Sequence, residues 1–169
     1  IDKYLGADYP LYNDYFDTYR RRGMTPDYVV PDYLTAWLMS EYPFSGNDNV
    51  LLDRMIYEGK IKYVTHQAFS EVWMKYTSEE YRWCSENESR LWRQIIERKQ
   101  LYTPDRVTTS KYFLERPSSF ISDGAPGNLG TWIGWRIVTR YMERTNVSVA
   151  ELMNHNDAQD ILTKSKYKP

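Results

Sequence analysis

The feature that most constrains this fold is a helical repeat of apolar positions in the middle of the chain. Its members recur three or four residues apart, as on the buried face of a helix, and are Leu51, Leu52, Met55 and Ile56. Gly59 continues this face, although a glycine inside a helix costs about 1 kcal/mol relative to alanine. Glu58 stands beside it, so a carboxylate neighbours a residue without a side chain. Two interpretations stay open. Either Glu58 anchors a buried polar network or served as a ligand, or it forms a solvated pair with Lys62 four residues on.

Similar periodicity elsewhere predicts a mainly α fold, a multi-helical array of about seven helices in a single domain covering residues 1–169. The expected helices cover residues 9–22, 32–42, 51 to between 65 and 76, 78–99, 103–114 and 131–144, with two short ones after 148 and 156. Residues 1–8 are expected to form a short strand. Residues 25–31 are expected to be an extended connector, because a residue before proline is disfavoured in the α region.

Several expected helix starts carry side chains with capping chemistry. These are Asn47 or Asp48, Asp32, Thr77 with Glu80, Ser148 with Glu151, and Asn156 or Asp157. Inside the apolar helix 131–144, Gly134 lies four residues after Gly130, so both share one face and permit a neighbouring backbone to approach closely.

Charge and composition exclude several classes of protein. The net charge is −1 with 27% charged residues in mixed order, so the chain lacks the basic footprint of a nucleic-acid-binding protein. Apolar runs reach only four or five residues, against the ~20 that cross a bilayer. Aromatic residues make up 16%, which fits either a helical core or a groove for a sugar or peptide.

Residues suited to catalysis do not combine into a recognisable arrangement. The two histidines, His66 and His155, lack partners at zinc-ligand spacing. Cys84 is the single cysteine and lies on an apolar helical stripe, as a structural thiol would. The glycine-rich stretch 124–130 lacks the lysine and hydroxyl of a phosphate-binding loop, which favours a shaped turn. The sequence therefore predicts no catalytic, cofactor-binding or metal-binding residues, and no cofactor.

Five stretches resemble one known family. They are YLGADYPLY (4–12), YVVPDYLTAWLMSEYP (28–43), LLDRMIYEGKIKYV (51–64), GAPGNLGTWIGWRIVTRYM (124–142) and DAQDILTKSKYKP (157–169). Together they resemble the gliding-motility lipoprotein GldB family of the Bacteroidetes, across nearly the whole chain. The resemblance implies the C-terminal part of a lipoprotein that faces the periplasm. It also implies a membrane anchor through an N-terminal lipid outside this chain, and partners among envelope or gliding-machinery proteins.

A more distant similarity links the block LLDRMIYEGK to gluzincin-type metallopeptidases. In that resemblance Glu58 matches the third zinc ligand, and two histidines are expected near residues 31–35, where this chain has Pro-Asp-Tyr-Leu-Thr. Without two neutral imidazoles, a zinc ion would not lower the pKa of a bound water to about 7. The similarity therefore implies a degenerate, zincin-like cleft near Asp32, Glu58 and Trp132.

These resemblances favour a non-catalytic binding or assembly component of the cell envelope. Two alternatives stay open. One is an active zinc-dependent peptidase whose ligands lie upstream of Ile1, and the other is a glycan-binding module that uses the tyrosine- and tryptophan-rich surface.

Overall fold

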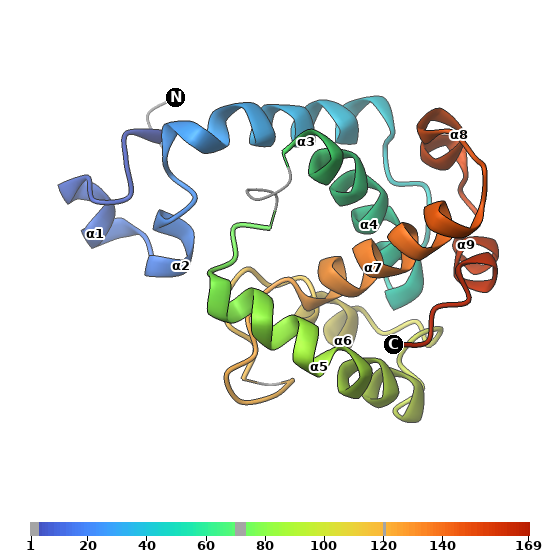
Figure 1. The fold of residues 1–169 in the computed structure, drawn as a ribbon. Helices are drawn as coiled ribbons and strands as arrows, with labels where there is room; N and C mark the ends of the chain where they lie inside the picture. The colour runs from blue at the N-terminus through green and yellow to red at the C-terminus, as the bar shows by residue number, and fades with distance from the viewer. Residues whose placement is uncertain (1–3, 70–73, 120) are drawn as a thin grey trace.

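A computed structural model describes residues 4–69, 74–119 and 121–169, and within these ranges it is all helical, without a strand (Figure 1). The α-helices in that part of the chain are α1 (Pro10–Tyr15), α2 (Thr18–Arg21), α3 (Val29–Glu41), α4 (Leu51–Ala68), α5 (Ser78–Glu97), α6 (Arg106–Lys111), α7 (Leu129–Arg144), α8 (Val149–Asn154) and α9 (Ala158–Ser165). A 3-10 helix, Pro26–Tyr28, precedes α3. The mainly α class is confirmed, although the array holds more and shorter helices than predicted.

The crossing of α4 and α7 forms the centre of the fold, where Figure 1 shows the two helices side by side. Gly59 of α4 and Gly134 of α7 meet at this crossing. A Cβ atom on Gly59 would lie 2.3 Å from the Gly134 backbone, and one on Gly134 would lie 1.8 Å from the carbonyl oxygen of Met55. Only glycine therefore fits at either position. The predicted close approach is confirmed for Gly134, whereas Gly130 instead faces the ring of Phe113.

The main hydrophobic core surrounds this crossing. Helix α7 supplies buried residues on nearly every side, and α5 packs against it through Cys84, Leu91 and Ile95. A smaller cluster of Leu38, Ile61 and Met153 joins α3, α4 and α8. Burial of apolar surface is the dominant favourable term in folding, so the α4–α7 pair organises the molecule.

The predicted N-terminal strand is wrong for the described residues from Tyr4 onward, and residues 1–3 lie outside the described part. Gly6 has φ +131° and its amide donates to the carbonyl oxygen of Met24 at 3.0 Å, so this segment is a turn. The predicted helix 9–22 is in fact two helices, because the backbone at Phe16 is extended. That extended residue packs its ring edge-to-face on Tyr12, with centroids 5.7 Å apart.

The predicted connector 25–31 is also wrong, since residues 26–28 form the 3-10 helix and α3 begins at Val29. Pro31 lies in the first turn of α3, where backbone amides have no partner within the helix, so its missing N–H costs little. Asp32 consequently lies inside the helix and does not cap it.

Two predicted capping boxes are confirmed, at Thr77 with Glu80 and at Ser148 with Glu151. The prediction for α9 is met by Asp157, whose side chain accepts from the amide of Asp160. Helix α4 differs from its prediction, because Val50 precedes it and no side chain caps its start. Helix α6 likewise starts later than residue 103, at the residue that follows its cap, Asp105.

Candidate functional site

Glu58, the residue on which the predicted cleft centres, is half-buried on α4 next to the helix crossing. Burial raises the pKa of Glu58, while the positive charges of Lys62 and Arg54 act in the opposite direction. Burial lowers the pKa of Lys62, and the carboxylate of Glu58 opposes that shift. The interaction with Lys62 is therefore present, but it lies in a partly desolvated environment and not in open solvent.

Asp32, a second charged residue of the predicted cleft, binds the ammonium group of Lys75. Its two carboxylate oxygens accept hydrogen bonds from the Lys75 ammonium at 2.7 and 2.8 Å, and Oδ2 also accepts one from the Tyr4 hydroxyl at 2.9 Å. Lys62 experiences the charges of Glu58, Lys75 and Asp32 together. Asp32 and Glu58 thus both act electrostatically on Lys62, and Asp32 in addition forms an ion pair with Lys75.

Trp132 lies apart from these charged residues, in the aromatic core. It is 2% exposed, and its ring contacts those of Tyr76, Tyr81 and Trp135 at centroid distances of 6.3, 5.0 and 5.3 Å. Aromatic pairs at such distances stabilise a core beyond the area that they bury. A cleft shared by all three predicted residues remains a prediction.

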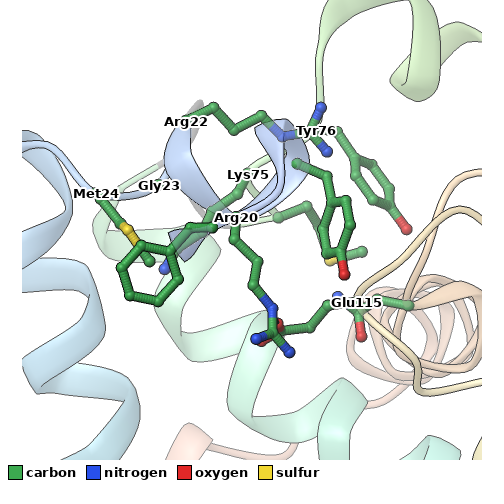
Figure 2. A pocket seen from close by; sticks show the side chains of 11 residues that line it. Arg20, Arg22, Gly23, Met24, Lys75, Tyr76 and Glu115 are labelled. Carbon is green, nitrogen blue, oxygen red and sulfur yellow. The ribbon is translucent and has the colours of Figure 1, made fainter. Parts of the chain in front are cut away.

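A cavity of about 360 Å³ lies beside these residues, and Figure 2 shows the side chains that line it. Its described lining comprises Phe16, Tyr19, Arg20, Arg22, Gly23, Met24, Met74, Lys75, Tyr76, Glu115 and Asn128. None of the three predicted cleft residues is in that lining. Lys75, however, binds Asp32, and Tyr76 packs against Trp132, so the cavity adjoins both.

Three cations in the cavity wall are each paired with a carboxylate. Arg20 Nε lies 3.0 Å from Glu115 Oε2, and Figure 2 shows the Arg20 side chain running toward Glu115. Arg22 makes two contacts with Glu80, at 2.8 and 3.0 Å. Lys75 forms the third pair, with Asp32. Each of these cations therefore has a carboxylate partner, and among the three carboxylates Glu115 belongs to the described lining of the cavity.

Gly23 allows the side chain of Lys75 to cross the cavity wall. A Cβ atom on Gly23 would lie 2.7 Å from the Lys75 Cδ. The ammonium of Lys75 lies over the Tyr28 ring, 5.1 Å from its centroid, and also contacts Asp32. The Gly23 backbone and the Lys75 side chain thus lie in close contact in the cavity wall.

The histidines and the cysteine lie elsewhere. The His66 ring stacks on Trp135 at 5.1 Å, and His155 Nε2 lies 2.8 Å from a carboxylate oxygen of Asp160. Within residues 4–69, 74–119 and 121–169, no three His, Cys, Asp or Glu side chains cluster as a metal site would require. Cys84 is fully buried, and burial raises the pKa of its thiol to about 12. The absence of a metal or cofactor remains a prediction.

Lys60 is a buried group that the sequence analysis missed. Its ammonium donates to the backbone carbonyl oxygens of Met153 and His155 at 3.1 and 3.0 Å, and so ties α4 to the end of α8. Burial lowers the pKa of Lys60 to about 8. A local signal existed in the position of Lys60 on the buried face of α4, four residues after Ile56, although a lysine in an amphipathic helix is ordinarily solvated.

Glu88 is a second buried ionisable group. Its carboxylate accepts from Arg136 Nε at 3.0–3.1 Å and from the Tyr167 hydroxyl at 2.9 Å. Here a signal existed, because Glu88 falls on the apolar stripe of α5. The triad fixes the C-terminal segment against α5 and α7.

Most of the exposed large apolar side chains lie before residue 40. On α3, Val30, Tyr33 and Trp37 are 58%, 71% and 48% exposed. Their spacing of three and four residues places them on one face of the helix, here called the α3 apolar face. On α1, Leu11 and Tyr15 are 55% and 76% exposed and border a shallow apolar hollow. Exposed apolar clusters of this kind are typical of interaction surfaces.

In the described part of the chain, no helix combines the length and the apolar character that crossing a membrane demands.

Comparison with known proteins gives one positive result. A family model described as "Gliding motility protein GldB" matches residues 1–169. No curated protein and no solved structure matches the chain.

Proposed function

The chain belongs to the GldB family of gliding-motility lipoproteins, which supports a location in the cell envelope, and we propose that it acts there as a non-catalytic binding or assembly component. Its partner is an envelope or gliding-machinery protein that docks on the α3 apolar face. We also propose that the chain faces the periplasm and that it carries a degenerate zincin-like cleft, as the two resemblances imply.

The observation that carries this proposal is the exposure of the α3 apolar face. Tyr33 and Trp37 combine large apolar area with a polar tip, and residues of this kind dominate the binding energy of protein–protein interfaces. Helix α3 buries only Pro31 and Leu38, so most of its surface is available to a partner.

Complementation of a gliding strain that lacks its own family member tests the binding role. The double variant Tyr33→Ser/Trp37→Ser should lose gliding while the protein accumulates normally, because exposed positions contribute only about ±0.5 kcal/mol to stability. Tyr102→Ser is the matched control, since Tyr102 is 55% exposed but lies outside α3. Gliding at the wild-type rate in the double variant would contradict the proposal.

The variant Glu58→Gln, tested in the same gliding strain, distinguishes a non-catalytic protein from an active peptidase whose further ligands lie upstream of Ile1. Glu58→Gln keeps the shape of the side chain but removes the carboxylate that a zinc site would need. A non-catalytic protein should glide normally with this variant. Chelator-sensitive cleavage of casein by the longer protein, lost in Glu58→Gln, would instead establish the peptidase.

A further inference from the structure

We infer that the cavity between residues 16–24 and 74–76 is a binding site for an uncharged, hydroxyl-rich ring of one or two sugar units. Its volume of about 360 Å³ lies within the range of small-molecule sites, which span roughly 300–1,000 Å³. The inference stands independently of the protein-binding role, because the α3 apolar face does not line this cavity.

The pairing of all three wall cations with carboxylates disfavours an anionic ligand. Arg20, Arg22 and Lys75 would form an anion site if they were unpaired. Each of them instead contacts a carboxylate, from Glu115, Glu80 and Asp32 respectively. A phosphate or carboxylate ligand would have to compete with these charge-assisted hydrogen bonds. A neutral ligand leaves all three ion pairs in place.

Polar atoms at the rim match the hydroxyl groups of a sugar. The Arg20–Glu115 pair joins Nε to one carboxylate oxygen, and within the described residues the structure records no partner for the other guanidinium nitrogens or the second oxygen. The pair therefore presents donors and an acceptor side by side. A sugar hydroxyl both donates and accepts, so neighbouring hydroxyls can bind such a pair through complementary hydrogen bonds.

Asn128 adds a second donor–acceptor group at the start of α7. Its backbone is left-handed with φ 55°, a conformation that asparagine tolerates, and its side chain does not cap the helix. Asn128 belongs to the cavity lining, its side chain has no capping role, and an asparagine amide offers one carbonyl acceptor and two N–H donors.

Aromatic rings supply the apolar part of the site. Phe16, Tyr19 and Tyr76 line the cavity. The Tyr76 hydroxyl donates to the carbonyl oxygen of Gly127 at 2.5 Å, which fixes the orientation of that ring. The faces of aromatic rings are electron-rich and attract the weakly positive C–H groups of a sugar ring. The Arg20–Glu115 ion pair at the rim can bind hydroxyl groups, and the aromatic walls can contact C–H groups. Together they suit a ligand that carries both, as a sugar ring does.

Saturation-transfer NMR on the full 169-residue chain tests the inference with maltose, cellobiose and N,N′-diacetylchitobiose as probes, and with glucuronate and inorganic phosphate as charged controls. At least one neutral disaccharide should bind, with an affinity in the range of about 1–10 mM. Arg20→Gln and Asn128→Gly should each weaken that binding about ten-fold, equivalent to about 1.4 kcal/mol. Glycine is chosen at 128 because it keeps the left-handed backbone.

The matched control is Tyr102→Ser, because Tyr102 is exposed, lies outside the cavity and should leave binding of the same disaccharide at the wild-type level. Arg20 is half-exposed, so Arg20→Gln should fold normally even if Asn128→Gly does not, and circular dichroism verifies this. The inference is overturned if glucuronate or phosphate binds more tightly than every neutral sugar, or if no disaccharide binds at about 20 mM. It is equally overturned if Arg20→Gln binds like the wild type. Failure here would leave the gliding result with Tyr33→Ser/Trp37→Ser unaffected.

Discussion

Replacing Gly134 by alanine places a methyl group against the backbone of α4. The added Cβ would lie 1.8 Å from the Met55 carbonyl oxygen, and ordinary contact begins at 3.4 Å. The helices would have to separate by the difference, 3.4 − 1.8, or about 1.6 Å. Neither atom can rotate away, because the obstacle is backbone on both sides of the crossing. The strain therefore reaches the entire α4–α7 contact.

The magnitude follows from three contributions. Overpacking a core costs about 1–3 kcal/mol and sometimes more, and a backbone obstacle lies at the upper end of that range. Moving the helices apart also loosens buried neighbours such as Ile133 and Ile137. The higher helix propensity of alanine returns about 1 kcal/mol. We expect Gly134→Ala to lower the free energy of unfolding by about 3 kcal/mol net, which lowers the melting temperature by roughly 6–12 °C in a chain of this size.

Gly130→Ala is the matched control, because it makes the same substitution in the same helix, away from the α4 backbone. Its Cβ would meet the Phe113 ring at 2.6 Å, but that ring is a half-buried side chain beneath Arg54 and can shift. Its expected cost is below about 1 kcal/mol. Urea unfolding followed by circular dichroism measures both variants. Equal unfolding free energies for the two, within about 0.5 kcal/mol, would refute the assignment of the crossing as the rigid centre of the fold.

Three further predictions concern buried groups. Lys60 has a pKa of about 8 in the folded protein, against 10.5 ordinarily, so between these pH values the unfolded chain binds more protons than the folded one. The free energy of unfolding of the wild type, relative to that of Lys60→Met, should therefore rise from pH 8 to 10.5. Urea unfolding across that pH range gives the slope, and a flat or falling difference would contradict the burial of the ammonium. Cys84, with its pKa raised to about 12 and no exposed surface, should react with a thiol reagent at pH 8 only after denaturation; rapid labelling of the native protein would show that the core opens. Tyr167→Phe removes one hydrogen bond to buried Glu88 and should cost about 1–2 kcal/mol in thermal unfolding, whereas an unchanged melting temperature would mean that Arg136 alone satisfies the carboxylate.

Local sequence patterns were sufficient for the helical class and for many helix positions. The apolar stripe of α5 and the capping boxes at Thr77 and Ser148 depend on bonds between residues three or four apart, so the sequence carries them directly. Even the buried carboxylate of Glu88 lies on that stripe, among the buried residues Cys84, Leu91 and Ile95. Local rules failed at Pro31, where a proline is tolerated in the first turn of α3, and at Phe16, where an extended residue interrupts the expected helix.

The candidate sites depended on contacts that no local pattern encodes. Asp32 meets Lys75 across 43 residues, and Lys60 meets the His155 carbonyl across 95. The sequence alone determined that the chain forms amphipathic helices with a glycine-permitted close approach. Only the tertiary structure decided which charges pair, which lysine is buried and where a cavity remains, because those outcomes depend on how separate helices pack and not on the spacing within any one of them.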